Sequence, residues 1–244
     1  MANYITYGSS FGSVPFHPSQ LAGGQLYLRK DQATVSSWVS DIGTARNFSQ
    51  GVAGKQPIIS TNSVDFDGIN EIQGLSESHP FGADTQGSMF ISGYFDNSAL
   101  NIMLSTTDAS ANNEFSYFGI NTDGKLRMTF NNSNSGGSSN IIDGTIVIPN
   151  GSYYYIRFTG NGIGNPYTFS VNGVTDTLVA TAGTNNSKWF DSLLTTDRLS
   201  LAALIRPSNF FSPVSINKIY YNNTVLTSGE ISNMDTFMSD PTNY

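Results

Sequence analysis

The sequence predicts an all-β protein: a two-sheet antiparallel jelly-roll β-sandwich with one short C-terminal helix. Apolar and polar residues alternate over 154–158 and again over 167–171, which is the period of two that strands have. Asn172-Gly173 then turns the chain into 174–179, and this pair favours a tight hairpin because both turn positions need a positive φ. Asp123-Gly124 predicts a second hairpin between 115–120 and 125–130. Repeated hairpins with polar turns are typical of β-sandwiches.

Length and composition fit one large domain. The chain has 244 residues, of which 38% are apolar and 12% aromatic, so it can bury a sizeable core. Only 12% are charged, and Asn, Ser, Thr and Gly must therefore cover most of the surface. The sequence contains no cysteine, which excludes disulfides, thiolate nucleophiles and cysteine-ligated zinc.

The charge balance argues against two classes of partner. Lys plus Arg number 11 and Asp plus Glu number 18, so the net charge is −7, and Arg29-Lys30 is the only adjacent basic pair. We therefore expect binding neither to nucleic acid nor to an acidic membrane surface. The first residues lack the basic and apolar regions of a secretory signal, and no run approaches the ~20 apolar residues of a membrane span.

The chain divides into an arm and a sandwich. Residues 1–24 are predicted to form an N-terminal arm, because Gly and Pro break every regular pattern there, and residues 25–244 form the sandwich. The stretch 8–12, GSSFG, matches the G-x-S-x-G pattern of a hydrolase nucleophile elbow. That elbow needs a helix directly afterwards, and Val14-Pro15 cannot start one, so we interpret the stretch as part of the arm.

Further strands follow along the sandwich. We expect them at 26–28, 64–68, 89–95, 101–106, 198–205 and 215–221, with shorter runs at 141–142 and 145–148 and a polar Asn/Ser/Gly loop over 131–140. The residues predicted to lie mainly in the core are Phe66, Phe90, Ile91, Ile156, Phe169, Leu201 and Ile219.

One helix is predicted near 228–238. Thr227 and Glu230 have the spacing of a capping box, in which each side chain bonds the backbone of the other residue. Ile231, Met234 and Met238 follow at helical spacing. We expect this apolar face to pack on the edge of the sandwich.

Two sets of residues are candidates for ligand binding. Asp65, Asp67 and Asn70 supply the oxygens that calcium prefers, although an Asp-Gly turn at 67–68 explains the same residues without a metal. No other cofactor is indicated. Trp189 lies in the polar loop 181–191 and is the candidate sugar-stacking residue; the alternative is that it fastens this loop to the core.

Four motifs together resemble the concanavalin A-like lectin/glucanase superfamily in its laminin G-like form. The opening over 26–57 includes Trp38, and Val64-Asp65-Phe66-Asp67-Gly68 resembles the family's V-x-F-D-G strand and turn. Phe169–Gly173 resembles its Y-V-N-G hairpin, and 219–231 resembles its closing strand and helical turn. The family often has an Asp where Arg29 stands and another shortly after the D-G turn, where Asn70 stands, and both differences weaken an inherited metal site.

This resemblance implies a binding or structural role. Domains of this kind occur in tailed-phage structural proteins, so we expect a non-catalytic module of a virus particle: a capsid-decorating, fibre or tail protein on the virion exterior, made in the host cytoplasm. Its expected partners are other virion proteins, bound through the arm, with a glycan and further copies of the chain as candidates.

A free carbohydrate-binding lectin is the alternative, and a polysaccharide hydrolase is a third. The family's hydrolases carry a Glu-x-Asp-x-x-Glu or Glu-x-Asp-x-Glu strand, and the four glutamates of this chain do not form it. His17 and His79 each precede a proline, with no metal or triad partner apparent.

Overall fold

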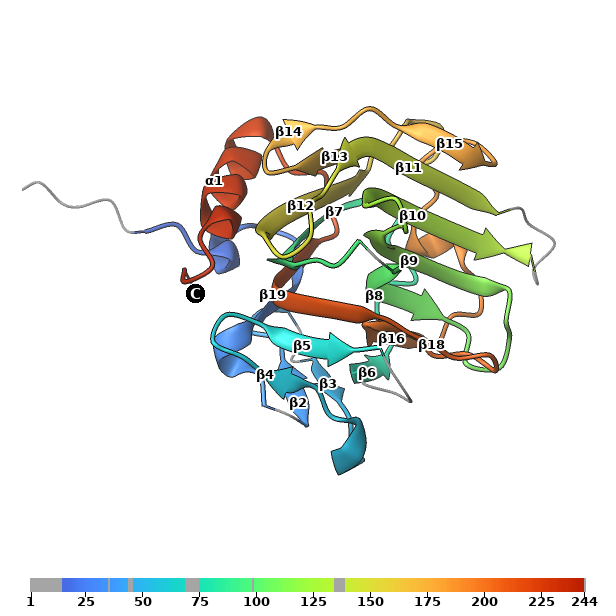
Figure 1. The fold of residues 1–244 in the computed structure, drawn as a ribbon. Coiled ribbons are helices and arrows are strands. Elements are labelled where there is room, and N and C mark those ends of the chain that lie inside the picture. Colours follow the sequence, from blue (N-terminus) through green and yellow to red (C-terminus); the bar gives the residue numbers. More distant parts are fainter. Residues whose placement is uncertain are drawn as a thin grey trace, which may run out of the picture.

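The computed structural model describes residues 15–34, 36–43, 46–68, 75–97, 99–133 and 139–243. Two large antiparallel sheets form a jelly-roll-like β-sandwich with one α-helix, as the sequence predicts (Figure 1). Within the described ranges, no helix is both long and apolar enough to cross a membrane.

The first sheet, sheet A, is built around the strand nearest the C-terminus. Its path is β14-β13-β12-β7-β19-β5-β4, and β1 also pairs with β19. The strands are β1 (Gly24–Arg29), β4 (Ile58–Ile59), β5 (Val64–Asp67), β7 (Gly87–Tyr94), β12 (Tyr153–Gly160), β13 (Thr168–Val171), β14 (Val174–Thr175) and β19 (Pro213–Asn222). One half of β19 pairs with β5 and the other half with β1, while β7 lies along its opposite side.

The second sheet, sheet B, has the order β15-β11-β10-β9-β8-β16-β6-β3-β2. Its strands are β2 (Ser37–Val39), β3 (Asn47–Ser49), β6 (Leu75–Ser78), β8 (Asn101–Thr107), β9 (Glu114–Ile120), β10 (Lys125–Asn132), β11 (Asn140–Val147), β15 (Val179–Ala182) and β16 (Arg198–Leu201). A separate hairpin, β17 (Ala203–Leu204) and β18 (Phe210–Phe211), follows β16. The predicted strand 198–205 is therefore interrupted, and the break falls at Ala202, whose φ is 55°.

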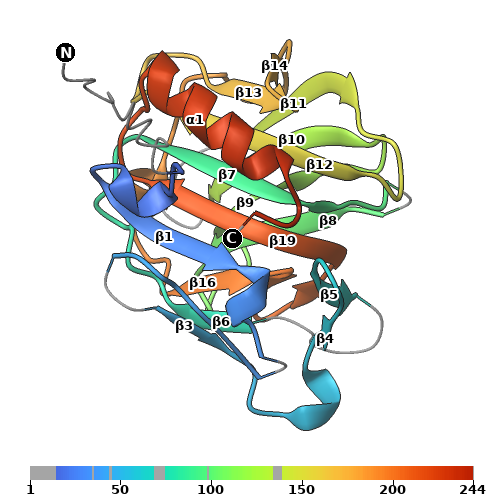
Figure 2. The same cartoon turned by 90° about the vertical axis from the view of Figure 1, so that its left-hand side faces the viewer.

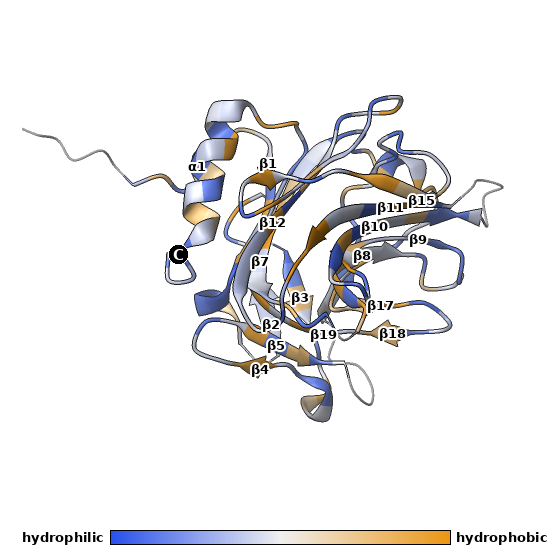
Figure 3. Cartoon of the chain, turned by 45° about the horizontal axis from the view of Figure 1, so that its top comes forward, coloured by the Kyte–Doolittle hydropathy of each residue, from blue (hydrophilic) through white to orange (hydrophobic). Residues whose placement is uncertain are grey.

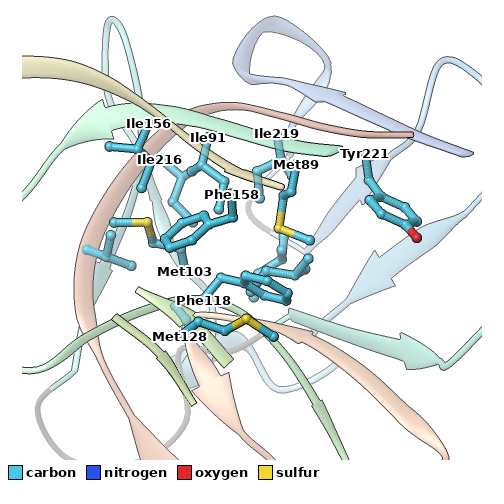
Figure 4. Packing of buried hydrophobic residues seen from close by; sticks show 14 of the residues in the cluster. Met89, Ile91, Met103, Phe118, Met128, Ile156, Phe158, Ile216, Ile219 and Tyr221 are labelled. Atoms are coloured by element: carbon cyan, nitrogen blue, oxygen red, sulfur yellow. The ribbon is translucent and has the colours of Figure 1, made fainter. Parts of the chain in front are cut away.

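The core lies between the sheets. Figure 4 shows Ile91, Ile156 and Ile219 of sheet A packed toward Phe118 and Met128 of sheet B. Every residue predicted for the core is buried. Phe90 is the exception in position, because it neighbours Ile91 on β7 and so faces the other side of sheet A, where it belongs to a second cluster.

The helix α1 (Ser228–Ser239) covers that second cluster. Thr227 N donates to Glu230 Oε2 at 2.8 Å, and Glu230 N donates back to Thr227 Oγ1 at 3.4 Å, so the predicted capping box is present. The expectation that the helix packs on the sandwich edge is wrong. It lies across the outer face of sheet A, over β7 and β12, because Phe90 and Tyr155 make that face apolar (Figure 2).

The described end of the arm packs on the same cluster. Phe16 contacts Phe237 of α1 with ring centroids 6.2 Å apart, and Leu21 packs beside them. Asn222 on β19 donates its side-chain amide to Ala22 O at 2.8 Å. Residues 15–23 therefore belong to the chain's own sandwich. The rest of the predicted arm, including the G-x-S-x-G stretch, lies outside the described residues.

Candidate functional site

The β17–β18 hairpin covers part of the outer face of sheet B, over β8. Side chains at alternate positions of β8 point outward because the intervening ones face the core. Ser105 Oγ donates to Ala203 O at 2.5 Å, and Thr107 Oγ1 donates to Ile205 O at 2.7 Å. These bonds hold the hairpin beside β8 (Figure 3), and the loop between its two strands reaches Phe115 on the outer face of β9.

Two stacked aromatic rings lie on the outer face of β9, beside the β17–β18 hairpin. Phe115 and Tyr117 are two residues apart on β9, so they share the outer face, and their rings are stacked with centroids 6.4 Å apart and planes 7° from parallel. Ile102 and Leu204 pack with them. The arrangement gives the outer face a buried aromatic base.

A guanidinium group from the hairpin loop lies over this base. Arg206 Cζ stands 4.7 Å from the centre of the Phe115 ring, a cation–π contact. Its Nη1 donates to Asn112 O at 2.6 Å and its Nε to Ser208 O at 3.1 Å. Among the described residues, no carboxylate lies within ion-pair distance of it. Burial lowers the pKa of Arg206, but an arginine stays charged in proteins.

A second guanidinium is paired with an acid across two strands. Arg127 on β10 and Asp143 on β11 are register partners, and Nε–Oδ1 and Nη2–Oδ2 are both 2.7 Å. Thr181 on β15 donates to Asp143 Oδ2 at 2.9 Å. Burial raises the pKa of Asp143, but hydrogen bonds from Arg127 and Thr181 outweigh burial and hold it below its usual value. The bond to Asp143 raises the pKa of Arg127, so both groups stay ionised near neutral pH.

The site also contains a buried hydroxyl. Thr129 stands opposite Tyr117 and Ile141 in the sheet, and its Oγ1 is buried without a hydrogen-bond partner among the described residues. We name this set the β9–β11 face; its members are Phe115, Tyr117, Arg127, Thr129, Asp143 and Arg206. With two guanidinium groups and one carboxylate it carries a local charge of about +1, on a chain whose net charge is −7.

The predicted calcium residues are not brought together in the described part of the chain. Asp65 accepts hydrogen bonds from Ser60 Oγ and, at 2.6 Å, from Ser63 Oγ, the local role expected of an Asp beside a turn. Asp67 is exposed at the end of β5, and Asn70 lies outside the described residues. Within the described ranges, no three His, Asp or Glu side chains are placed to share a metal ion.

Trp189 is not a sugar-stacking surface, so that expectation is wrong. Its side chain is 1% exposed, and its indole N–H donates to Tyr221 Oη at 3.1 Å. Tyr221 donates in turn to Asp84 Oδ2 at 2.8 Å. The residue fastens its loop to the core, which is the alternative stated above.

Sequence reasoning missed the β9–β11 face. The alternation over 125–130 places Arg127 on the outward side of a predicted strand, but Asp143 falls between the predicted runs 141–142 and 145–148, which β11 joins into one strand. Their pairing could have been inferred only with the register of the two strands. Arg206 arrives from a hairpin about 90 residues further along the chain than Phe115, and no local pattern shows that contact.

Known proteins resemble this chain in structure and not in sequence. No family model matches the sequence, and no curated protein matches it significantly. The carbohydrate-binding module CBM40 of the Ruminococcus gnavus IT-sialidase, bound to α2,3 sialyllactose, superposes with a TM-score of 0.54 and 16% identity, covering 63% of this chain and 84% of that chain. The same module bound to α2,6 sialyllactose gives 0.54 and 14%, covering 71% and 96%.

Whole sialidases also contain a similar structure. The Trypanosoma rangeli sialidase superposes with a TM-score of 0.62 and 12% identity, covering 91% of this chain but 33% of that chain. At these identities the likeness establishes a shared fold. The chain has the β-sandwich fold of modules found in sialidases.

Proposed function

We propose that this chain is a glycan-binding module that holds an acidic glycan on the β9–β11 face. One observation carries the proposal: the Arg206 guanidinium lies over an aromatic base, and no carboxylate of the described residues pairs with it. The sandwich that presents it has a carbohydrate-binding module among its structural neighbours. Membership of the concanavalin A-like superfamily, which the motifs resemble, is part of the same proposal.

The chemistry of the face fits a sugar that carries a carboxylate. A guanidinium recognises a carboxylate through parallel N–H···O bonds, and the hydrogen bonds named above for Arg206 use only its Nε and Nη1. A hydroxyl group of a sugar can donate to a remaining lone pair of Asp143, whose side chain is partly exposed. The sialyllactose bound by the neighbouring module is an acidic glycan of this class.

We propose binding without catalysis. Three glutamates of the chain lie in the described residues, and each has a structural partner. Glu77 accepts from Asn47 N and pairs with Arg46, Glu114 accepts from Leu194 N, and Glu230 caps α1. Hydrolysis of a glycosidic bond needs two carboxyl groups, Asp or Glu, facing one bound sugar, and the β9–β11 face as defined above contains one, Asp143, which Arg127 and Thr181 hold ionised.

The expected role in a virus particle has no support among the neighbours described above, which are sialidases and a sialidase module. Glycan binding, the alternative from the sequence, is the better-supported function.

Calorimetric titration with 3′-sialyllactose and with lactose tests the proposal. We expect the acidic glycan to bind at least about tenfold more tightly, since charge-assisted hydrogen bonds are worth ~1.5–3 kcal/mol. Arg206→Gln should remove that preference, whereas Lys55→Ala, which removes a positive charge on a distant turn, should keep it. Added salt should weaken binding of the acidic glycan. Equal affinity for both glycans, or an Arg206→Gln variant that keeps the preference, would contradict this assignment.

A further inference from the structure

A cavity of about 430 Å³ opens on the other sheet, where β5, β7 and β19 meet the loop before β12. Three buried apolar residues of the core, Phe66, Phe95 and Val214, are part of its lining. Its rim is polar and aromatic, with Tyr94, Asp96 and Asn150. The volume lies within the ~300–1,000 Å³ of small-molecule sites, and an apolar lining with a few convergent polar groups is their usual composition.

The polar rim is fixed by a buried asparagine. Asn101 is 0% exposed, and its Oδ1 accepts from Asp96 N at 3.2 Å. Its Nδ2 donates to Asp96 O and, at 2.9 Å, to Ala99 O. The fully buried Asn101 side chain therefore bonds both the backbone N–H and the backbone C=O of Asp96, and so fixes the position of that residue.

The second loop of the rim is tied to the first. Asn97 N donates to Asn150 Oδ1 at 2.5 Å, and Asn97 Nδ2 donates to Ile148 O at 3.1 Å. The two loops come from distant parts of the chain, so these bonds bring Asp96 and Asn150 to one opening. Because these hydrogen bonds hold the rim in place without a ligand, binding would lose little conformational entropy in ordering it.

Tyr94 gives the opening an aromatic side. It is the outward-facing neighbour of Ser215 and Tyr153 in sheet A, and the Tyr153 ring meets it edge-on at 5.5 Å and 64°. This contact restricts the orientation of the Tyr94 ring. An aromatic face carries partial negative charge, which attracts the slightly positive C–H groups of a sugar ring.

We propose that this cavity is a second glycan site, specific for a neutral pyranose. The Asp96 carboxylate accepts hydrogen bonds from sugar hydroxyls, and the Asn150 side chain offers a further polar group. Among the described residues that line the cavity there is no Lys or Arg, so a sugar carboxylate would meet only the repulsion of Asp96. The chemistry is thus opposite to that of the β9–β11 face, and the two sites belong to different sheets.

Gly151 supplies a variant that fills the opening. Its φ is +75°, and a Cβ added to it would meet nothing within 4 Å. Asparagine tolerates positive φ better than other side chains, so Gly151→Asn introduces a side chain at the rim with less strain than other substitutions would.

The test is a titration of isotope-labelled protein with methyl α-D-glucopyranoside, galactopyranoside and mannopyranoside, followed by NMR. We expect at least one of them to shift the amide signals of Tyr94, Asp96 and Gly151, and Asp96→Ala and Gly151→Asn to raise its dissociation constant at least about tenfold. Tyr94→Phe keeps the ring and should keep binding, whereas Tyr94→Ala should lose it. Asp123→Ala, which removes an exposed carboxylate from another turn, should have no effect.

Arg206→Gln separates this site from the first. It should leave pyranoside binding unchanged, so failure of acidic-glycan binding and failure of the second site are distinguishable. The second site is wrong if none of the three pyranosides shifts these signals, or if the one that does binds Asp96→Ala and Gly151→Asn as tightly as the unmodified protein.

Discussion

His79 is a half-buried histidine whose two ring nitrogens are buried and have no hydrogen-bond partner among the described residues. Its ring meets those of Phe81 and Phe190 edge-on, at 5.9 and 5.4 Å. Burial, aided by the nearby charge of Arg46, lowers the pKa of His79 to about 4. The folded protein therefore holds this side chain neutral at a pH where the unfolded chain would protonate it.

Stability should consequently depend on pH. The contribution of neutral His79 is complete above the unfolded pKa of ~6.5 and is lost as the pH falls toward 4, because the unfolded chain binds the proton first. Between pH 7 and pH 5 the loss from this group should be about 2 kcal/mol, measured by urea unfolding. His79→Phe should reduce the loss, and His17→Gln should not. An unchanged pH dependence in His79→Phe would show that other groups cause it.

Gly160 illustrates how closely the core is packed. A Cβ at this position would lie 2.3 Å from Cε3 of Trp189, an atom of a buried ring that cannot move aside easily. Gly160→Ala should therefore lower the free energy of unfolding by about 1–3 kcal/mol. Gly229 is the matched control, since a Cβ there meets nothing within 4 Å. Gly229→Ala should be neutral or stabilising in urea unfolding, and equal effects of the two variants would refute the packing argument.

At the scale of elements, the cap of α1 is a testable unit. Thr227→Ala removes the side-chain bond to Glu230 N and should cost about 1 kcal/mol of unfolding free energy, by chemical denaturation. Thr236→Ala is the control within the same helix, because its hydroxyl bonds only the preceding turn at Ser232 O. The cap has no stabilising role if both variants cost the same.

The elements that the sequence predicted well are those with local signals. The Asn172-Gly173 turn has φ values of 47° and 77°, as its residue types indicate, and the helix begins where its capping box lies. The break at Ala202 has no such signal, since alanine seldom adopts a positive φ. The hydrogen bonds between β8 and the hairpin fix the backbone conformation after Ala202. A prediction based only on the run of apolar residues therefore continues the strand through the break.

At the scale of the whole molecule, the candidate site was the least predictable part. Because its loop is polar, the sequence allowed an accessible Trp189. A polar loop is equally compatible with a buried indole whose N–H donates to one hydroxyl partner, as it does to Tyr221. The β9–β11 face depends on strand register and on a hairpin that folds back over the sheet. Both are long-range features, and single-sequence patterns report only neighbours along the chain.

The position of β19 has a consequence for synthesis. This strand occupies the interior of sheet A, between β7 on one side and β1 and β5 on the other, and it pairs Gly24 with Asn222. Sheet A therefore stays in three unconnected parts, β14-β13-β12-β7, β5-β4 and β1, until β19 has been synthesised. A version ending at residue 212 should be insoluble or lack the folded β-sheet signal in circular dichroism. Until β19 has been made, the edges of β1, β5 and β7 that it covers are open to pairing with other chains, however stable the finished sandwich is.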